Sequence, residues 1–456
     1  MLLNVLYMDF IFTVKHMREM KESGIEWIGQ IPKEWETVKL KYVAPKIERG
    51  TAPDYTEDEN MTRVVNQATF SKGTFDTSKL RFSTKPAELS RGLLKRGDTL
   101  VASTGGGVLG KTYYFDENEV YVADGHVTVI RPEESLAVSK FLHYFISVNY
   151  DTLNACMAEG STNQTELQRE LFCNMYFPSP NIIEQQAIVT FLDSKCAEID
   201  ALSSDIQSEI ETLEAYKRSV ITEAVTKGLD KNLPMKDSGI EWVGEVPEHW
   251  DVRKIKYTLF SRSENNNPIR SKNILSLTAK QGVIPLNERE GGGNKPKEDY
   301  SAYKLAYPND IVMNSMNILS GAVGLSKYFG CVSPVYYMLR PQDAQDDVRY
   351  YHDIFQTRVF QKSLRGLGNG ILIKESDNGT LNTIRMRIPL DTLGNVKIPV
   401  PPSDEQKEIA DYIEKNVLQL DSILVQKQKQ LSILAEYKKS LIYEYVTGKK
   451  EVPQDA

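Results

Sequence analysis

The chain has 456 residues, of which 26% are charged and 41% hydrophobic, and its formal net charge is −7. This composition is typical of a globular protein with several cores, and the net charge argues against a strongly basic nucleic-acid binder. No apolar run approaches the length of a membrane span, so we expect a cytoplasmic protein without a membrane partner. The 4 cysteines and 5 histidines show neither a disulfide framework nor metal-ligand spacing, so no metal or cofactor is predicted.

The first residues read MLLNVLYMDFIFTVKH, which is an apolar stretch interrupted by Asp9. The stretch lacks the basic region and the small-residue cleavage site of a signal peptide. We interpret residues 1–19 as a short extension, and both Met1 and Met20 stay open as the start of translation.

The most informative feature is an internal duplication. Residues 20–42, MKESGIEWIGQIPKEWETVKLKY, match residues 235–257, MKDSGIEWVGEVPEHWDVRKIKY, at 13 of 23 positions with an offset of 215. A second matched pair lies downstream at an offset of 221, where two P-x-x-x-E-Q-x-x-I segments each lead to a YK-x-S sequence. The duplication predicts the order segment, helix, segment, helix.

The last part of each repeat has a strong helical pattern. Asn181 with Glu184, and Ser403 with Gln406 in a capping-box pattern, supply start signals. Apolar residues recur at every seventh position, and Lys427 interrupts the second stripe. An isolated stripe would indicate a dimerisation stalk, but two stripes that alternate with two globular segments favour an antiparallel coiled coil that holds two heads. The expected seam residues are Leu192, Ile199, Ile206, Leu213, Val220, Ile413, Leu420, Leu434 and Leu441.

The globular segments, which we call head 1 (about residues 36–179) and head 2 (about residues 251–399), carry short β-branched and aromatic runs separated by turn residues. We therefore predict an α+β fold with two strand-rich domains and two long helices. Each head also contains one predicted helix, in which His143 aligns with His352, and packing explains both histidines without chemistry. The predicted boundaries are 1–19 for the extension, 20–179 for domain 1, 180–233 for the central helix and linker, 234–400 for domain 2 and 401–456 for the C-terminal helix.

The charge is distributed unevenly along the chain. Residues 60–115 carry 9 lysines and arginines against 3 acids, and residues 252–340 carry 13 against 6. The central helical segment, residues 181–233, carries 5 against 10. Although a single basic stretch is usually a solvated face, its recurrence in both heads favours a nucleic-acid interface there.

Side chains that can address phosphates and base edges occur in both basic stretches. Asn265 and Asn267 are of this type, as are the residues that we select as candidates for DNA contact. The candidates are Asn66, Gln67, Ser71, Lys72, Arg91, Ser103, Thr104, Lys111 and Tyr113 in head 1, and Arg270, Lys272, Thr278, Lys280, Gln281, Asn314, Ser315, Asn317 and Lys327 in head 2. A structural turn is an equal alternative for each residue of the glycine loop described next.

The stretch STGGGVLGKT at residues 103–112 fits the phosphate-binding pattern G-x-x-x-x-G-K-[ST] from Gly105 to Thr112. The pattern requires a strand before it and a helix after it, yet the residues that follow indicate two further strands. Head 2 repeats the strand and the glycine turn, with Asp98 matching Asp310, but Leu325 and Ser326 follow its Gly324. A DNA-facing loop is therefore preferred to an ATP site.

The duplicated S-G-I-E-W-[IV]-G-x-[IV]-P-x-x-W openings and the paired helices with P-x-x-x-E-Q-x-x-I starts resemble those of the DNA-sequence specificity subunits of type I restriction-modification systems. The resemblance spans nearly the whole chain from Met20. It implies that each head is a target-recognition domain for one half of a bipartite site in double-stranded DNA. It also implies that the coiled coil sets the half-site spacing and docks two modification (adenine methyltransferase) subunits, with motor-nuclease restriction subunits joining the complex.

The same resemblance implies a subunit without catalytic residues. An adenine methyltransferase needs a [DNS]-P-P-[YF] tetrapeptide, whereas Pro401-Pro402 is followed here by Ser403. Two alternatives stay open at this point, a P-loop ATPase built on Gly105–Thr112 and an orphan coiled-coil scaffold that binds DNA alone.

Overall fold

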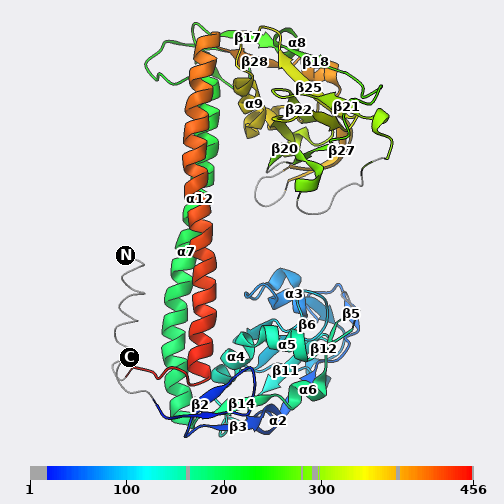
Figure 1. Ribbon diagram of the computed structural model, residues 1–456. Coiled ribbons are helices and arrows are strands. Elements are labelled where there is room, and N and C mark those ends of the chain that lie inside the picture. The colour runs from blue at the N-terminus through cyan, green and yellow to red at the C-terminus, as the bar shows by residue number, and fades with distance from the viewer. Residues whose placement is uncertain are drawn as a thin grey trace. The chain divides into compact units, whose positions relative to one another are not determined.

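The structure is a computed structural model that describes residues 18–160, 165–278, 281–289, 296, 298–375 and 381–453, with the side chains of 369–386 left aside. Residues 1–17 of the predicted extension lie outside this part. The chain forms two compact units, unit 1 (Met1–Ile206 with Gln430–Ala456) and unit 2 (Gln207–Lys429) (Figure 1). Each unit takes one head and a part of both long helices, so the predicted domain boundaries stay predictions.

Head 1 contains two four-stranded sheets. The strands of the first are antiparallel throughout, and those of the second include one parallel pair, β10 with β6. The runs TLVA and VTVI at the centre of the first sheet are buried and mostly β-branched or aliphatic, which suits a central strand. Three strands, not the predicted two, follow the glycine loop. The first sheet has the order β4 (Lys46–Arg49), β11 (Val127–Arg131), β8 (Thr99–Ala102), β9 (Thr112–Tyr114), and the second β10 (Tyr121–Ala123), β6 (Thr62–Val65), β7 (Arg81–Ser83), β5 (Tyr55–Thr56).

Two-stranded pairs and short helices complete unit 1. The pairs are β1 (Met20–Glu22) with β2 (Gln30–Pro32), β3 (Glu36–Lys39) with β14 (Tyr176–Ser179), and β12 (Ala158–Glu159) with β13 (Glu166–Leu167). The short helices are α2 (Leu40–Val43), α3 (Gln67–Phe70), α4 (Ser139–Val148), α5 (Tyr150–Cys156) and α6 (Arg169–Cys173). Helix α4 is the one predicted for this head.

Head 2 repeats the first sheet of head 1 as an antiparallel sheet with the order β18 (Leu259–Arg262), β25 (Tyr336–Pro341), β22 (Ile311–Asn314), β23 (Val323–Leu325). Its other strands form pairs. These are β15 (Met235–Asp237) with β16 (Glu245–Pro247), β17 (Asp251–Lys254) with β28 (Lys397–Val400), β19 (Leu275–Thr278) with β20 (Gly282–Pro285), β21 (Lys304–Ala306) with β24 (Gly330–Val332), and β26 (Asn369–Glu375) with β27 (Leu381–Arg387). The short helices are α8 (Ile255–Thr258), α9 (Val348–Gln356), α10 (Arg358–Ser363) and α11 (Leu390–Gly394), and α9 confirms the helix predicted for this head.

Two long helices, α7 (Ile182–Lys227, 46 residues) and α12 (Ser403–Val446, 44 residues), confirm the predicted pair. They run antiparallel in both units (Figure 1). In unit 1 Asp200 pairs with Lys438 at 2.6 Å, and in unit 2 Lys217 pairs with Asp421 at 2.6 Å. Eight of the nine expected seam residues are buried, and Leu213 is half-buried. Lys427, which breaks the stripe, forms an ion pair with Glu209.

A buried glutamine fixes the start of each long helix to its head. The Gln185 amide accepts a hydrogen bond from Val138 N at 2.8 Å and donates to Pro180 O at 2.8 Å. Gln406 accepts from Asp347 N at 3.1 Å and donates to Asp346 Oδ1 at 3.0 Å. Both side chains are completely buried, so each must replace its lost water with hydrogen bonds inside the protein.

Both long helices begin where the sequence predicts, but only one of the two predicted caps forms. Asn181 caps α7 by accepting from Glu184 N at 2.9 Å. Ser403 is already inside α12, and its hydroxyl donates to Asp346 Oδ1 at 2.8 Å. The predicted capping box between Ser403 and Gln406 is therefore replaced by a shared carboxylate from the head.

The second tryptophan of each duplicated motif, Trp35 or Trp250, packs against the end of a long helix. Trp35 is 1% exposed and donates to Glu184 Oε2 at 3.1 Å, and a Cβ added to Gly448 would come within 3.0 Å of its ring. In unit 2 a Cβ added to Gly228 would come within 3.2 Å of the ring of Trp250, which is fully buried. The W-x₇-W spacing of the repeated motif thus serves helix packing.

Candidate nucleic-acid interface

A buried ion pair positions the strand that enters each candidate loop. Asp98, just before β8, is completely buried and accepts two hydrogen bonds from Arg131, at 2.6 and 2.7 Å. Asp310 is likewise buried before β22 and accepts from Arg340 Nε at 2.6 Å. Because a buried carboxylate is costly without a partner, this pairing fixes the strand and the loop that leaves it.

The glycine loop of head 1 connects β8 to β9, two antiparallel neighbours in one sheet. Gly105, Gly107 and Gly110 have φ values of +92°, +82° and +83°, a region that favours glycine. Thr112 is the first residue of β9, so the chain continues as a strand where a phosphate site needs a helix N-terminus. The P-loop ATPase alternative is therefore wrong.

The register of the strands corrects one detail of the comparison between heads. Ala102 N donates to Lys111 O at 2.9 Å, and Asn314 N donates to Ala322 O at 3.0 Å. The structural counterpart of Gly110 is thus Gly321, which also has a positive φ of +77°, and not Gly324. Ala322 and Val323 then occupy the places of Lys111 and Thr112, so head 2 still lacks the phosphate-binding pair.

A chain of contacts, which we call the head-1 patch, surrounds the glycine loop. The Thr104 hydroxyl lies 2.9 Å from His126 Nδ1, and His126 N donates to Asp124 Oδ1 at 2.8 Å. Asp124 also accepts from the Tyr55 hydroxyl at 3.4 Å, and the Arg81 guanidinium lies 4.8 Å from the Tyr55 ring centre. The patch therefore combines a cation, an aromatic ring and two adjustable hydrogen-bonding groups.

Two groups of this region are held away from water. Burial raises the pKa of the Asp124 carboxyl, although the hydrogen bond from His126 N opposes this shift. The Oε1 atom of Gln67 is buried without a hydrogen-bond partner among the described residues, and its Nε2 lies 3.5 Å from a Cβ built on Gly105. A buried amide oxygen without a partner is unfavourable.

Head 2 has a different cluster, the head-2 cluster, in which two arginines approach aromatic rings. Arg262 lies 4.4 Å from the ring centre of Tyr307, and Arg270 lies 5.9 Å from the ring centres of Tyr307 and Phe329. Glu264 accepts from the Tyr307 hydroxyl at 2.9 Å and forms an ion pair with Arg270. Such cation–aromatic stacks can also receive nucleic-acid groups.

The structure separates the predicted DNA-contact residues by exposure. Half-buried residues retain part of their polar surface for a ligand. Those that are exposed are Lys72, Arg91, Arg270, Lys272, Gln281, Asn317 and Lys327, and those that are half-buried are Asn66, Gln67, Ser71, Thr104, Lys111, Thr278 and Asn314. Lys280 lies outside the described residues.

Two candidates, Ser103 and Ser315, are corrected because their side chains are buried, and a third, the half-buried Tyr113, has a local packing role. Ser103 is fully buried and bonds to Thr128 Oγ1 at 2.5 Å, and Ser315 donates to Val335 O at 2.8 Å. Tyr113 packs on aromatic rings and donates to Glu117, and burial raises the pKa of its phenol to about 12. The side chains of Ser103 and Ser315 therefore support the strands, whereas DNA contact by Tyr113 stays a prediction.

Some half-buried candidates also have a local structural task. Asn66 caps α3 by accepting from Ala68 N at 2.8 Å, and it donates to Lys79 O at 2.8 Å. Thr278 accepts from Gln281 N at 2.9 Å in the turn between β19 and β20. A local structural role therefore competes with DNA contact at these two residues.

The sequence interpretation missed Tyr55, Arg81 and His126 in head 1, and Arg262 and Tyr307 in head 2. Each lies on a different strand or loop from its neighbours in space, so no local pattern groups them. The only available signal for His126 was its place in the turn A-D-G-H between two strands.

No group of three or more histidine, cysteine, aspartate and glutamate side chains in the described ranges is arranged to hold a metal ion. In the same part of the chain, no helix is both long and apolar enough to cross a bilayer.

Comparisons with known proteins agree with this architecture. The family described as "Type I restriction modification DNA specificity domain" matches residues 32–212. A putative type I restriction enzyme MjaX specificity subunit from Methanocaldococcus jannaschii is 22% identical over 444 residues, which cover 93% of this chain and 96% of the relative. The MjaVIII specificity subunit of the same organism is 22% identical and covers 71% of this chain and 74% of its own.

A solved structure supports the fold. A chain from a study titled "Structural basis underlying complex assembly and conformational transition of the type I R-M system" aligns with a TM-score of 0.65 at 15% identity. The alignment covers 92% of this chain and 99% of the solved one. Residues 32–212 thus match the DNA specificity domain of type I restriction-modification systems, and nearly the whole chain, with its duplicated heads and antiparallel helices, is similar to the specificity subunits of these systems.

Proposed function

We propose that this chain is a non-catalytic DNA-recognition subunit in which each head reads one half of a bipartite site in double-stranded DNA. The antiparallel helices set the distance between the half-sites and dock two adenine methyltransferase subunits, to which restriction subunits are added. The observation that carries the proposal is that the two heads share one frame but present different loops and polar clusters on it.

The charges of the heads support contact with phosphates. In head 1 Lys72 and Arg91 are exposed, and in head 2 Lys272 and Lys327 are exposed. Phosphate contacts give affinity and position, while the groups of the head-1 patch and the head-2 cluster are of the kinds that read base edges or stack on bases.

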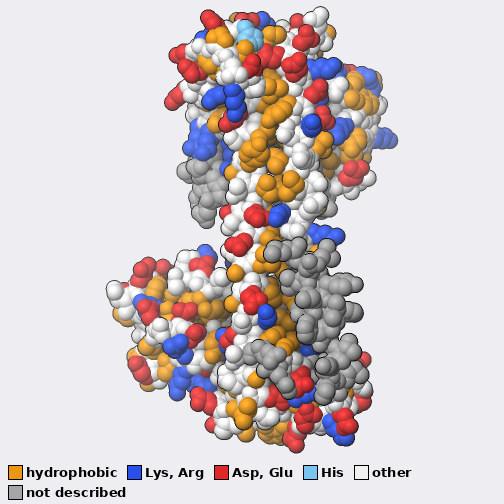
Figure 2. Space-filling view, turned by 90° about the vertical axis from the view of Figure 1, so that its left-hand side faces the viewer, with side chains coloured by type: hydrophobic (Ala, Val, Ile, Leu, Met, Phe, Trp, Pro, Cys, Tyr) orange, Lys and Arg blue, Asp and Glu red, His pale blue; other side chains and the backbone are white. Residues whose placement is uncertain are grey.

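The surface of the long helices supports protein docking. In unit 2 hydrophobic side chains gather along these helices (Figure 2). Leu418 and Val425, one heptad apart on α12, are 66% and 68% exposed, and Tyr216 of α7 is 56% exposed. Exposed apolar residues at heptad spacing are typical of a face that binds another protein.

The main test is an exchange of heads. Residues 36–179 would be replaced by head 1 of a relative, and methylated adenines would be mapped across the genome of a strain that carries the complete system. We expect one half of the motif to change and the other half to persist. A change in both halves, or methylation that does not depend on this gene, would refute modular reading.

A finer test uses neighbours in the glycine loop. Thr104→Val should alter recognition in one half of the motif, because it removes the hydroxyl beside His126. Ser103→Ala is the matched control, since Ser103 is buried, and it should leave the motif unchanged. Lys72→Ala should weaken binding to all DNA sequences about equally. It should also lower the slope of log binding constant against log salt concentration by about one, because one phosphate contact is lost.

Copurification separates this proposal from the orphan-scaffold alternative. The wild-type chain should retain methyltransferase subunits in stoichiometric amounts, whereas Leu418→Glu with Val425→Glu should lose them and still bind DNA. Ser422→Glu, an exposed polar position of the same helix, is the control. A chain that never copurifies with a methyltransferase, yet binds DNA specifically, would favour the scaffold.

A further inference from the structure

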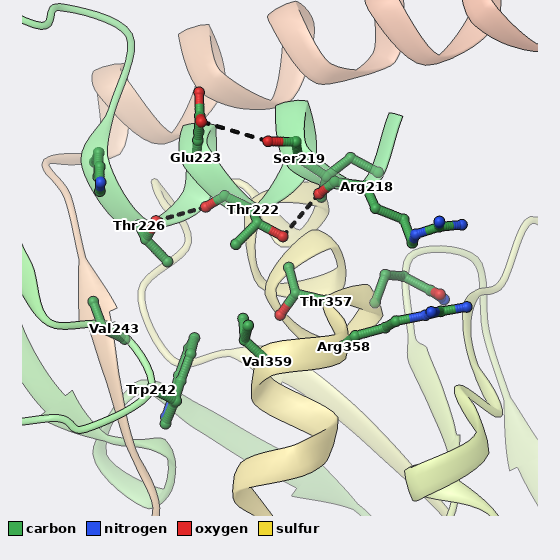
Figure 3. Close-up of a pocket in the computed structure, with 13 residues that line it drawn as sticks. Arg218, Ser219, Thr222, Glu223, Thr226, Trp242, Val243, Thr357, Arg358 and Val359 are labelled. Carbon is green, nitrogen blue, oxygen red and sulfur yellow. Dashed lines mark hydrogen bonds between the residues drawn. The ribbon is translucent and has the colours of Figure 1, made fainter. Parts of the chain in front are cut away.

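Unit 2 contains a groove of about 400 Å³ between the last turns of α7 and head 2. Figure 3 shows the side chains of α7 facing the start of α10, with Trp242 and Val243 beside them. Volumes of about 300 to 1,000 Å³ are typical of sites that enclose a ligand, so the groove has room for a large side chain and its neighbours. Its apolar walls are Ile221, Trp242, Val243 and Val359.

Unit 1 shows why the groove exists. At the repeat offset of 221, Thr222 of α7 corresponds to Tyr443 of α12. In unit 1 the Tyr443 hydroxyl donates to Trp27 O at 2.9 Å, and its ring lies 5.3 Å from the Lys449 ammonium. In unit 2 the Thr222 hydroxyl instead donates to Arg218 O on its own helix at 2.8 Å, which leaves the space beside Trp242 open.

The charge of the groove indicates what could enter it. Three of its residues are cationic, Arg218, Lys227 and Arg358, and one is acidic, Glu223. Glu214 lies 3.8 Å from Arg218 and offsets its charge only in part, because both side chains are exposed. An entering segment with negative charge would be attracted, while a basic one would be repelled.

We propose that this groove docks an aromatic side chain within an acidic segment of a partner protein, and that unit 1 lacks an equivalent site because Tyr443 occupies it. The docked ring takes the place that Tyr443 has in unit 1, against Trp242 and Val243, while its acidic neighbours face Arg218 and Lys227. The site is independent of DNA reading, and it makes the two helix ends of this chain unequal as protein-binding surfaces.

The test uses the full chain and a fluorescein-labelled peptide with tyrosine between two pairs of aspartates. Binding is followed by fluorescence anisotropy, with the same peptide carrying alanine for tyrosine, or lysine for aspartate, as controls. We expect the tyrosine peptide to bind with a stoichiometry of one. Thr222→Tyr should weaken it about tenfold or more by filling the groove, and Thr222→Ser should leave it unchanged.

Two further results decide the matter. Tyr443→Thr should open the corresponding space in unit 1 and add a second binding site, and DNA binding by Thr222→Tyr should stay at the wild-type level. Absence of binding to the wild-type chain, equal binding of the alanine peptide, or undiminished binding to a folded Thr222→Tyr chain would each overturn the proposal.

Discussion

In head 1 the loop after β8 exposes Gly106 and Gly107 and places Thr104 beside His126, whereas the corresponding turn of head 2 buries Ile318 and Leu319. The strands that carry the two loops are nevertheless equivalent in order and register. A rigid frame with different loops is a common way to obtain different binding specificities from one fold. The comparison indicates that the two repeats share the strands of their common frame and differ in the loops that face a ligand.

The shared frame consists of buried polar anchors. The Asp98–Arg131 pair recurs as Asp310–Arg340, and the Gln185 anchor recurs as Gln406. A polar group inside a core tolerates few geometries, because each of its hydrogen bonds must be replaced. These anchors therefore limit how far the two heads can diverge.

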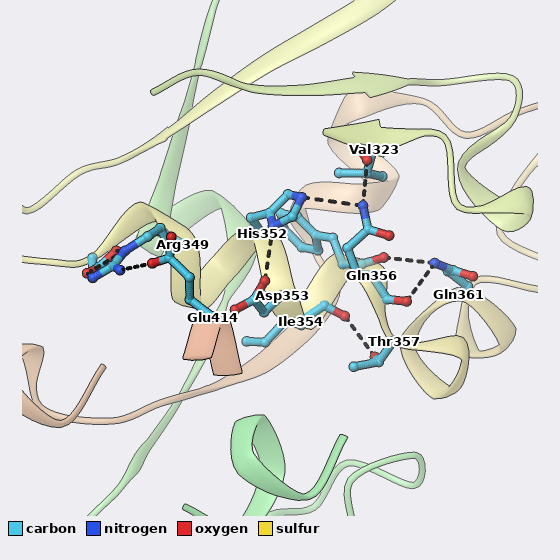
Figure 4. A network of polar contacts seen from close by, with 11 residues as sticks. Val323, Arg349, His352, Asp353, Ile354, Gln356, Thr357, Gln361 and Glu414 are labelled. Carbon is cyan, nitrogen blue, oxygen red and sulfur yellow. Dashed lines mark hydrogen bonds and ion pairs between the residues drawn. The ribbon is translucent and has the colours of Figure 1, made fainter. Parts of the chain in front are cut away.

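The aligned histidines show divergence inside the frame. Burial and, to a smaller extent, the nearby Lys140 lower the pKa of His143 to about 4, and Asp193 opposes the shift. In head 2 the His352 ring bonds to Asp353 Oδ1 at 3.0 Å and to Gln356 Nε2 at 3.3 Å (Figure 4). The interpretation of both as packed residues agrees with these surroundings, but only head 2 gives its histidine polar partners.

The largest effect is expected from the ion pairs of the frame. Asp98→Ala should destabilise head 1, and Asp310→Ala head 2, by about 3–5 kcal/mol, because each leaves a partly buried arginine without its partner. Hydrogen exchange followed by mass spectrometry can report each head separately. Loss of protection in the unmutated head, or a small effect in only one of the two, would contradict the idea of a common frame.

The pH dependence of head 1 should reveal His143. Its folded pKa of about 4 lies below the unfolded value of 6.5, so the unfolded state binds the proton more readily. Stability should be complete above about pH 6.5 and fall by up to about 3 kcal/mol as the pH decreases to about 4. Protection of head 1 against exchange, measured over this range, should become less pH-dependent in His143→Phe. An unchanged profile in that variant would remove His143 as the cause.

The helix anchors should differ in strength between the units. Gln185→Ala should lower the free energy of unfolding by about 2 kcal/mol. It leaves Val138 N without its hydrogen-bond partner and creates a buried cavity. Gln406→Ala should cost more, since Gln406 also bonds to Asp346 and to the Tyr351 hydroxyl at 3.2 Å. Denaturation followed by far-UV circular dichroism, together with hydrogen-exchange data for each head, can rank the stabilities of the two variants. A weaker effect at Gln406 would reverse the comparison.

The smallest effect concerns the seam. Lys427 stands where the first repeat has Ile206, which is 4% exposed. Lys427→Ile should make the two helices more alike and stabilise their pairing by about 1 kcal/mol, because it exchanges a weak ion pair with the half-exposed Glu209 for apolar burial. The thermal midpoint should rise slightly. A fall would mean that Lys427 is required for register.

The fold was largely predictable because its signals are periodic or repeated. Heptad spacing predicted α7 and α12, and the duplicated tryptophan motif predicted two related heads. The site was less predictable, since exposure depends on which face of a strand meets the core. Ser103 and Ser315 look like ligands for DNA in the sequence, yet one residue of strand alternation turns each of them inward.

By itself the sequence determined the duplication, the long helices, their antiparallel pairing and the resemblance to one family, because these properties depend on residue order and spacing along the chain. Only the tertiary structure decided that the glycine loop joins two strands, that Asp98 meets Arg131 and that Tyr443 fills a space left open at Thr222. Those properties depend on contacts between residues distant in the chain, and packing selects such contacts through shape, burial and hydrogen-bond geometry that no local pattern records.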